Sequence, residues 1–356
     1  MKKVLLVIPS LLQGGGQKFV LDLAQKLDKN KYTVKILIYY DAVADCFQDI
    51  IYTLNNNGLE IIRMNKNPGL DFSFFKSVKR FVKEYNPDII HTHLDTLLYL
   101  FPTFNKRQIK LHTVHSIAEK ESRGLQRLVR KIAFRFFKVK PIAISDTVAE
   151  SIKKCFKIKV VPVVYNGVIC ENYSGEKKQH EGINFIAVGT LYEVKNYGYL
   201  IDCFYELIKK YSDVSLTILG DGPLKNNLKN QIDELGISNK IFLVGAVSDV
   251  KNYLLNADVF VSSSLYEGLP LSMLEAMAAG LPIVTNDVGG IHDILKDGYN
   301  GYLVPLGEKE KYIEALERLI LDSNRRGLFS ENAKKLATNY DESNTIELYE
   351  KLYETK

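Results

Sequence analysis

Two glutamates with seven residues between them occupy the most informative stretch of the chain. Glu267 stands just before a predicted helix, and Glu275 stands about two turns inside it. Carboxylates at such places can accept hydrogen bonds from the hydroxyls of a sugar or a ribose. Apolar residues surround Glu275, so a carboxylate without a partner would be costly there. The alternative is that Glu267 caps the helix and Glu275 is an ordinary surface acid.

The start of this helix is suited to a diphosphate. Pro270 is predicted near the first helical position, while Gly280 and Pro282 mark the end. The first N–H groups of a helix have no partner within it, and the helix dipole is positive at that end. The turn at Glu267-Gly268 therefore indicates an anion site beside the two carboxylates.

A second candidate loop holds Gly14, Gly15 and Gly16 directly after the first predicted strand. Glycines let the backbone approach a ligand closely. A dinucleotide-binding fingerprint would need a glycine where Phe19 stands, although Asp41 could imitate the acid that binds ribose. A dehydrogenase is therefore disfavoured, and a turn without a ligand is the other alternative.

Histidines and cysteines add little chemistry of their own. His91 and His93 end a buried strand, where a hydrogen-bonded structural pair is favoured over catalysis, and His112 is expected to be structural. No Asp-x-Asp and no metal-ligand spacing occurs, so no obligatory metal is expected. The four cysteines show no CxxC or CxH spacing and indicate a reduced, cytoplasmic protein.

Residues 122–140 predict a basic amphipathic helix. Its apolar stripe, expected to face the protein, is Leu125, Leu128, Val129, Ile132 and Phe136. The candidates for a membrane-surface face are Arg123, Arg127, Arg130, Lys131, Arg135 and Lys138. Such a face would be attracted to anionic lipid. The alternative is an ordinary core-packed helix with a solvated basic side.

Charge divides the chain in two. Residues 1–175 hold 28 Lys and Arg against 15 Asp and Glu, a net charge of +13, whereas residues 176–356 hold 19 against 27, a net charge of −8. The opposite signs support a domain boundary and suggest an anionic partner for the first half. Nucleic acid is disfavoured because the basic residues form no recognisable motif and the second half is acidic.

The elements that must position these residues alternate between short β-branched runs and amphipathic helices, which is typical of parallel sheets. At 356 residues, the chain is long enough for two domains. The predicted strands of the first half are 4–8, 33–38, 88–91, 111–114, 142–144 and 160–164. Those of the second half are 183–188, 214–219, 241–244, 259–262, 282–285 and 302–304. No apolar run reaches the length of a membrane span.

Two doubly wound α/β domains follow from this pattern. We expect an N-terminal domain at 1–170, a linker at 171–182 and a C-terminal domain at 183–340. A last helix within 341–356 is expected to pack back on the N-terminal domain. Ligands of open α/β sheets bind beyond the carboxyl ends of the strands, so two such domains facing each other would place a site in the cleft.

The run from Tyr266 to Pro282 resembles the EX7E signature of retaining nucleotide-sugar glycosyltransferases of family 4, which have the GT-B fold of two Rossmann-like domains. Further matches follow in chain order at 14–16, 88–93, 112–116, 165–168, 188–196, 219–223 and 288–290. The resemblance covers nearly the whole chain and is thin between Tyr39 and Pro87, where acceptor-facing elements differ within such families.

This resemblance implies roles for individual residues. Glu275 would bind the ribose of the donor, Glu267 would contact the transferred sugar, and Lys195 would pair with the diphosphate and stabilise the leaving nucleotide. His115 would lie near the donor sugar and act as a third catalytic candidate. Further donor contacts would come from Gly15, Gly16, Thr190, Gly268, Leu269, Pro270 and Leu271. Thr190 departs from the family, which often has arginine there, so phosphate neutralisation would rest more on Lys195 or on a cation from elsewhere.

The expected activity is a retaining, metal-independent transfer from a nucleotide-sugar donor to a saccharide or lipid-linked acceptor. A UDP-sugar is favoured, a GDP-sugar is the alternative, and no cofactor is expected to be obligatory. The setting would be bacterial surface polysaccharide or glycolipid biosynthesis, in the cytoplasm or peripherally at the inner face of the cell membrane. The alternatives are a GT-B sugar-nucleotide epimerase and a non-catalytic nucleotide-sugar sensor.

Overall fold

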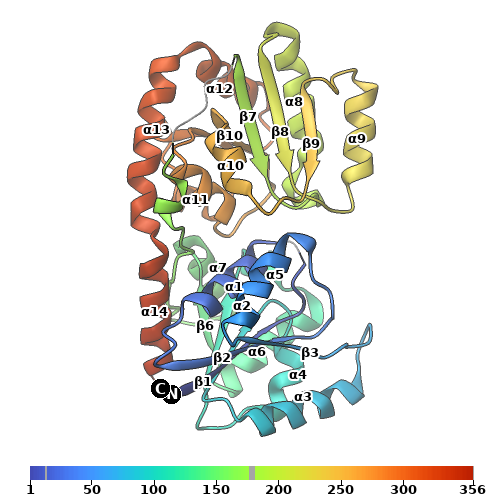
Figure 1. The fold of residues 1–356 in the computed structure, drawn as a ribbon, viewed down its shortest axis with the longest axis vertical. Coiled ribbons are helices and arrows are strands. Elements are labelled where there is room, and N and C mark those ends of the chain that lie inside the picture. Colours follow the sequence, from blue (N-terminus) through green and yellow to red (C-terminus); the bar gives the residue numbers. More distant parts are fainter. Residues whose placement is uncertain (13, 176–180, 356) are drawn as a thin grey trace. The chain divides into compact units, whose positions relative to one another are not determined.

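The chain divides into two compact units, each built on one parallel sheet (Figure 1). The computed structural model describes residues 1–12, 14–175 and 181–355. The first unit comprises Met1–Tyr165 with Thr345–Lys356, and the second comprises Asn166–Asn344. The predicted linker of residues 171–182 includes 176–180, which lie outside the described residues.

The first sheet has six parallel strands in the order β3-β2-β1-β4-β5-β6. The strands are β1 (Lys2–Ile8), β2 (Tyr32–Ile38), β3 (Glu60–Arg63), β4 (Ile89–His93), β5 (Ile109–Val114) and β6 (Lys140–Ala143). The helices between them are α1 (Gly15–Lys26), α2 (Gln48–Asn56), α3 (Phe72–Tyr85), α4 (Leu97–Leu100), α5 (Ala118–Glu121), α6 (Gly124–Phe136) and α7 (Asp146–Phe156). The strand order reverses between β1 and β4, as in dinucleotide-binding folds.

The second sheet repeats this topology in the order β12-β11-β10-β7-β8-β9, again with parallel pairing. Its strands are β7 (Ile183–Val188), β8 (Val214–Leu219), β9 (Ile241–Gly245), β10 (Val259–Ser262), β11 (Ile283–Asn286) and β12 (Gly301–Val304). Its helices are α8 (Tyr197–Lys210), α9 (Lys225–Glu234), α10 (Val250–Leu255), α11 (Leu271–Ala278), α12 (Lys309–Leu321) and α13 (Ser323–Ala337). The reversal here lies between β7 and β10, and all six predicted strands are confirmed.

The first sheet differs from prediction at its edge. The predicted strand at 160–164 is wrong, because only Val163 forms an isolated bridge, with Ala143. Pro162 has no N–H to continue a ladder, and Val160 is 79% exposed. The sixth strand is β3, which the sequence analysis missed because its four residues carry a charge at each end.

The inner strands of each sheet are covered on both faces, which explains their apolar runs. In β1, every residue from Val4 to Ile8 is fully buried. In the second unit, alternate strand residues such as Leu216 and Ile218 join one core with Leu200 of α8 and Leu316 of α12. The cores therefore fix the strands, and the loops at their carboxyl ends carry the polar chemistry.

The last helix, α14 (Glu342–Glu354), packs its buried tyrosines on the first unit. The Tyr353 hydroxyl lies 2.8 Å from Nδ1 of His91, and the Tyr349 hydroxyl lies 3.0 Å from Oγ1 of Thr113. Nζ of Lys2 donates to the carbonyl of Tyr353 at 3.0 Å, so the two chain ends lie side by side (Figure 1). The helix thereby completes the core of the first unit.

No helix in the described part of the chain combines the length and the apolar composition that crossing a membrane requires.

Candidate functional site

A lysine and a glutamate form an ion pair at the carboxyl edge of the second sheet. Nζ of Lys195 lies 2.6 Å from Oε1 of Glu267, and their side chains are 19% and 13% exposed. Lys195 ends a short 3-10 helix (Glu193–Lys195) that follows β7, whereas Glu267 follows β10. Ligands of such sheets bind where the strand order reverses, which in this sheet is between β7 and β10. Two predicted site residues thus meet at the expected place.

Serine hydroxyls in the loop after β10 hold both members of the pair. Oγ of Ser264 donates to Oε1 of Glu267 at 2.7 Å. Oγ of Ser263 donates to the carbonyl of Lys195 at 2.8 Å. The two loops are therefore bonded to each other, and the ion pair is preorganised on rigid elements.

The backbone of Glu267 is fixed by a glycine pair. A β-carbon on Gly289 would overlap the carbonyl oxygen of Glu267, and the N–H of Gly290 donates to that oxygen at 3.2 Å. Gly289 also has a φ of +57°, a conformation that other residues rarely adopt. Residues 288–290 are one of the matches to the family, and the structure shows that they hold the turn that carries Glu267.

Helix α11 begins directly after this turn and has no side-chain cap. The capping alternative for Glu267 is wrong, because its carboxylate bonds Lys195 instead. Pro270 occupies the N-cap rather than the first helical position, and Gly280, with a φ of +73°, follows the end of the helix as predicted. The first N–H groups of α11 therefore keep their capacity to bind an anion.

Glu275 lies on α11 among fully buried side chains, including Met273 and Leu274. It is only 7% exposed. The alternative of a solvated surface acid is therefore wrong, because a carboxylate in such surroundings is stable only with polar partners.

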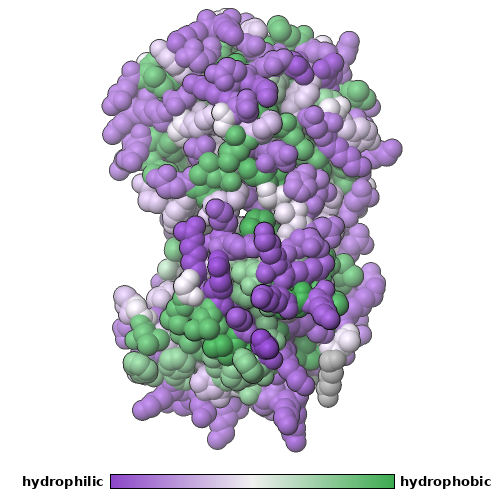
Figure 2. Space-filling view, turned by 180° about the vertical axis from the view of Figure 1, so that it is seen from behind, coloured by the Kyte–Doolittle hydropathy of each residue, from purple (hydrophilic) through white to green (hydrophobic). Residues whose placement is uncertain are grey.

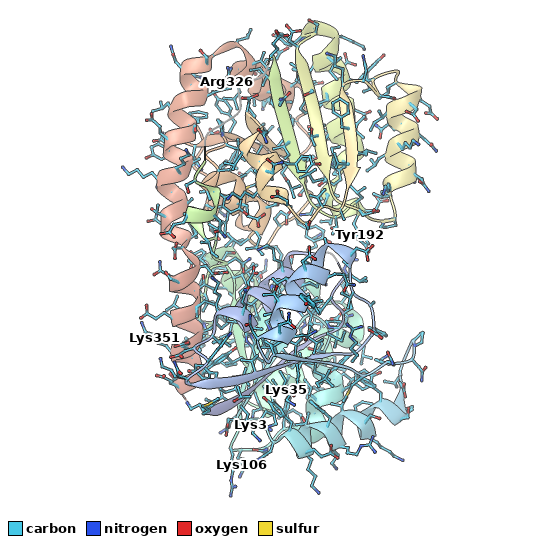
Figure 3. The ribbon with its side chains drawn as sticks, viewed as in Figure 1. Lys3, Lys35, Lys106, Tyr192, Arg326 and Lys351 are labelled. Atoms are coloured by element: carbon cyan, nitrogen blue, oxygen red, sulfur yellow. The ribbon has the colours of Figure 1, made fainter. Side chains whose placement is uncertain are left out.

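Thr190 lies in a tightly packed loop after β7. A β-carbon on Gly220 would overlap the carbonyl oxygen of Gly189, and the N–H of Leu191 donates to the carbonyl of Asp221 at 2.9 Å. The backbone around Thr190 is therefore fixed, while its side chain is partly exposed. Tyr192 in the same loop is 50% exposed and projects from this edge of the second unit (Figure 3).

In the first unit, the predicted residues Gly16 and His115 lie together. A β-carbon on Gly16 would lie 3.5 Å from the imidazole of His115, so the absence of a side chain brings the start of α1 onto the ring. Phe19 packs edge-on against His115, with 5.5 Å between ring centroids. Nε2 of His115 lies 3.0 Å from Nδ1 of His93.

The other two buried histidines have structural roles, as predicted. Nδ1 of His91 contacts Tyr353, and its Nε2 lies 2.7 Å from Oγ1 of Thr113. Nδ1 of His112 lies 2.9 Å from Oγ1 of Thr92. Burial lowers the pKa of His91 to about 3 and holds the pKa of His112 well below its usual value. Both rings are neutral core groups.

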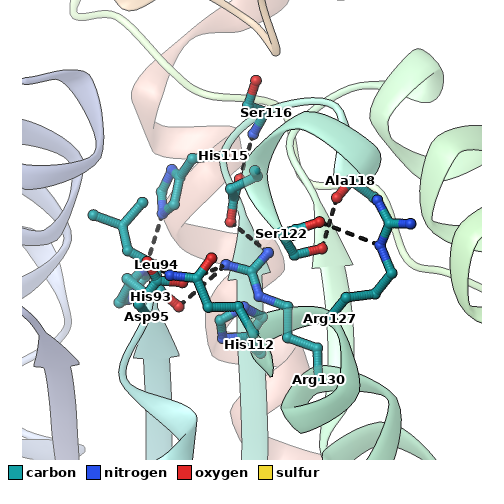
Figure 4. Close-up of polar contacts among 12 residues, drawn as sticks. His93, Leu94, Asp95, His112, His115, Ser116, Ala118, Ser122, Arg127 and Arg130 are labelled. Carbon is teal, nitrogen blue, oxygen red and sulfur yellow. Dashed lines mark hydrogen bonds and ion pairs between the residues drawn. The ribbon is translucent and has the colours of Figure 1, made fainter. Parts of the chain in front are cut away.

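A buried ion pair that was not predicted from the sequence lies beside His115 (Figure 4). Nη1 of Arg130 lies 2.8 Å from Oε1 of Glu121, and the side chains are 2% and 8% exposed. Oε2 of Glu121 accepts the N–H of Ser116 at 2.7 Å. Arg130 stands in a run of basic residues, so the sequence gives no sign that it is buried. Its acidic partner, Glu121, lies on the preceding helix α5.

Helix α6 therefore presents a different face from the predicted one. Arg130 is buried, so its assignment to a membrane-surface face is wrong. Leu125, Leu128 and Phe136 are 62%, 52% and 72% exposed, so the predicted inward stripe is wrong for these three. The exposed basic residues on or beside α6 are Arg123, Arg127, Lys131, Arg135 and Lys138. The first unit shows hydrophobic and hydrophilic surface side by side in Figure 2.

An apolar pocket of about 370 Å³ lies in the first unit, with lining residues that follow β1, β2 and β4. Leu70, Tyr99 and Leu125 contribute to its wall. Nζ of Lys66, which also lines it, donates to the carbonyls of Asn67 and Gly69 at 2.7 and 2.5 Å. The ammonium group of Lys66 is therefore already hydrogen-bonded to residues beside the pocket, and the pocket suits an apolar group.

Neither cysteines nor metal ligands gather at these sites. The four cysteines are free thiols. Within residues 1–12, 14–175 and 181–355, no three His, Cys, Asp or Glu side chains are arranged to hold a metal ion.

Two protein-family models match adjoining parts of the chain. The model described as Glycosyltransferase Family 4 matches residues 13–172, and the model described as Glycosyl transferases group 1 matches residues 171–336. Together they include every candidate site residue described above.

Individual relatives agree with these models. An uncharacterised glycosyltransferase of Methanocaldococcus jannaschii is 32% identical over 63% of this chain and 62% of that protein, less than two thirds of either. An Escherichia coli UDP-Gal:alpha-D-GlcNAc-diphosphoundecaprenol alpha-1,3-galactosyltransferase is 27% identical over 76% of this chain and 75% of its own length. The crystal structure of Anabaena HepE in complex with UDP and glucose superposes with a TM-score of 0.84 over 100% of both chains at 18% identity, which shows the shared fold.

Proposed function

The chain belongs to the superfamily of GT-B glycosyltransferases, and we propose that it transfers a sugar from a nucleotide-diphosphate donor to an acceptor hydroxyl with retention at the anomeric carbon. The observation that carries this proposal is the Lys195–Glu267 ion pair beside the uncapped start of α11. It combines a cation, a carboxylate and free helix N–H groups, which together suit the diphosphate and sugar of one donor.

In the proposed reaction, the bond between the anomeric carbon and the phosphate oxygen breaks, and the acceptor oxygen bonds to the same face of that carbon. The departing phosphate oxygen takes the proton of the acceptor hydroxyl. Lys195 and the first N–H groups of α11 stabilise the charge that grows on the diphosphate. Because they supply this positive charge, the proposal needs no obligatory metal.

The remaining donor contacts are assigned by chemistry. Glu275 accepts hydrogen bonds from the ribose, and Glu267 contacts the transferred sugar. Gly268, Leu269, Pro270 and Leu271 line the anion site, with Thr190 nearby in the loop after β7. His115, Gly15 and Gly16 add contacts from the first unit. Burial and then the Arg130 charge lower the pKa of His115 to about 3, so its neutral ring can bond a sugar hydroxyl.

The donor we propose is a UDP-sugar, with a GDP-sugar as the alternative. The Escherichia coli relative is a UDP-Gal galactosyltransferase, and the Anabaena HepE structure is a complex with UDP and glucose. A carboxylate such as Glu275 recognises ribose, which both nucleotides share, so it does not select the base.

The acceptor we propose is a saccharide on an apolar carrier, bound by the first unit. The pocket of about 370 Å³ has a largely apolar wall and suits the part of the carrier next to the sugar. The Escherichia coli relative is described by a diphosphoundecaprenol-linked acceptor. This chemistry supports a role in bacterial surface polysaccharide or glycolipid biosynthesis.

The place of action we propose is the cytoplasm, with peripheral attachment to the inner face of the cell membrane. Helix α6 exposes Leu128 and Phe136 together with Lys131 and Arg135, and the exposed Arg123 directly precedes it. Such attachment needs two contributions. Apolar side chains enter the headgroup region of the membrane, and basic side chains are attracted to anionic lipid.

Release of UDP from UDP-sugars, with and without a lipid-linked or alkyl glycoside acceptor, tests the proposed function. We expect release only with acceptor, an α-anomeric product from an α-linked donor by NMR, and unchanged rates in EDTA. Donor isomerised without acceptor would indicate an epimerase. Donor bound but left intact with every acceptor would indicate a sensor and overturn the proposal.

A further inference from the structure

The buried pair of Glu121 and Arg130 connects the loops after two neighbouring strands of the first unit (Figure 4). Removing two charges from water costs about as much free energy as their attraction returns, so a buried pair contributes little net stability compared with an apolar pair. Its contacts at the carboxyl edge of the sheet indicate what else it does.

Glu121 holds the loop after β5. Its Oε2 accepts the N–H of Ser116, the residue after His115, at 2.7 Å. This hydrogen bond fixes the peptide plane between His115 and Ser116. The direction in which the imidazole leaves the backbone is therefore set by Glu121.

Arg130 holds the loop after β4. Its Nη2 donates to the carbonyl of Leu94 at 3.3 Å and lies 3.5 Å from Oδ1 of Asp95. Leu94 has a φ of +52°, the left-handed region that a leucine rarely adopts. The guanidinium bond stabilises this strained residue, which directly follows His93.

The two loops meet at the imidazoles. Nδ1 of His93 lies 3.0 Å from Nε2 of His115, so the ring of His115 is held at its own backbone by Glu121 and at its Nε2 by a residue that Arg130 positions. Among the described residues no partner bonds Nδ1 of His115, which leaves this atom for a ligand hydroxyl. The Glu121–Arg130 ion pair thus holds both loops that carry the His93–His115 contact.

We propose that Glu121 and Arg130 are positioning residues for the transfer reaction, which hold His115 in the orientation that contacts the donor sugar. This proposal rests on the proposed function of His115. Neither residue is assigned a contact with the donor, so both act through the loops that they hold.

A double substitution separates positioning from stability. Glu121→Leu or Arg130→Met alone leaves one buried charge without a partner, and each is expected to lower the melting temperature. The double variant Glu121→Leu/Arg130→Met removes both charges, so we expect its melting temperature to return to within a few degrees of wild type. We expect its kcat to stay at least tenfold below wild type while its Kd for UDP is unchanged.

The matched control is an exposed ion pair of the same unit, Glu150 and Lys153 on α7. Glu150→Leu/Lys153→Met should leave kcat within twofold of wild type. A Glu121→Leu/Arg130→Met variant with wild-type stability and a kcat within twofold of wild type would overturn the proposal, because the pair would then be structural only.

A second readout does not depend on transfer. In the double variant we expect the Ser116 amide to exchange with solvent at least tenfold faster, and ¹⁵N NMR to show loss of the His93–His115 ring contact. An unchanged amide and unchanged rings would overturn the positioning role. Absence of transfer by the wild-type protein would instead overturn the proposed function and leave this readout to decide the role of the pair.

Discussion

Lys195 and Glu267 are 72 residues apart in the chain, and only 2.6 Å separate Nζ from Oε1. Ser264 donates to the same carboxylate oxygen, so the ammonium and the hydroxyl converge on one atom. When a diphosphate binds, the ammonium is in place to share its charge between the carboxylate and a phosphate. The pair is therefore expected to act as one unit.

Lys195→Ala should lower kcat roughly 100-fold and raise the donor KM much less, because charge on the diphosphate is greatest as it departs. Glu267→Gln should also lower turnover more than donor binding. The double variant should be little worse than Lys195→Ala, as expected for residues that act together. Lys225→Ala, which breaks the exposed ion pair with Asp221, is the control in steady-state kinetics. A change confined to KM would make Lys195 a ground-state binder.

Glu275→Ala should weaken binding of UDP by roughly 10- to 100-fold, because a hydrogen bond to a charged group contributes about 1.5–3 kcal/mol. Isothermal titration calorimetry on folded protein measures this directly. Glu331→Ala, which changes an exposed glutamate on α13, should bind UDP like wild type. Equal affinities for the two variants would remove Glu275 from the donor site.

The sequence predicted the fold well where hydrophobic pattern alone decides it. In the second unit, strands such as β10 and β11 are buried on both faces, and short apolar runs of this kind can be recognised without tertiary information. β3 was missed because Glu60 and Arg63 leave an edge strand with only two apolar residues. Such an edge strand forms because it pairs with a neighbouring strand, here β2, and its own sequence does not reveal this pairing.

The candidate site was predictable where loop residues follow strands, since topology alone brings Lys195 and Glu267 to one edge. Helix α6 was not, because its pattern of charges fits two orientations equally well. Arg130 faces inward only because Glu121 lies there to receive it, and Leu125 and Leu128 face outward as a consequence. One buried pair thus changes which residues of this helix face the protein.

The first unit should lose stability as the pH falls below about 6.5. Its buried histidines are His91, His93 and His112, His115 is partly buried, and desolvation holds the pKa of each far below 6.5. Unfolded histidine takes up a proton near pH 6.5, so the unfolded chain binds more protons than the folded one below that pH. Each ring then removes about 1.4 kcal/mol of stability per pH unit, down to its folded pKa.

Hydrogen exchange at pH 7.5 and pH 5.5 checks this prediction, because this range spans the usual pKa of histidine. Peptides of the first unit should lose protection at the lower pH beyond the intrinsic change in exchange rate. The second unit is the internal control, since its described histidine, His292, is exposed. Equal losses in both units would contradict the assignment to buried histidines.

Leu125→Asn should raise the KM for an alkyl glycoside acceptor several-fold, because Leu125 lines the apolar pocket. Comparison of the KM values for octyl and methyl glycosides gives the contribution of the alkyl group to acceptor binding. We expect this contribution to be smaller in the Leu125→Asn variant. Leu128→Asn is the matched control, since Leu128 is an exposed leucine of the same helix that does not line the pocket. If chain length makes no difference in wild type, the acceptor carrier does not bind there.

Attachment to anionic vesicles should depend on α6 and weaken as salt rises. Each basic residue near an anionic surface contributes about 1 kcal/mol, so Arg123→Gln/Lys131→Gln/Arg135→Gln should lower the partition coefficient roughly 100-fold at low salt. Arg127 is left unchanged because its guanidinium bonds the carbonyls of Ser122 and Glu119.

The matched control removes the same charge from another exposed helix of the first unit. Lys76→Gln/Lys79→Gln/Lys83→Gln on α3 should keep most of the vesicle binding in a sedimentation assay. Phe136→Ser should weaken binding even at high salt, because its 72% exposed ring contributes apolar area that ions do not screen. If the α3 triple variant and the α6 triple variant lose vesicle binding equally, the attraction comes from the net charge of the first unit and not from α6. Failure of the wild type to sediment with vesicles at low salt would leave α6 an ordinary surface helix.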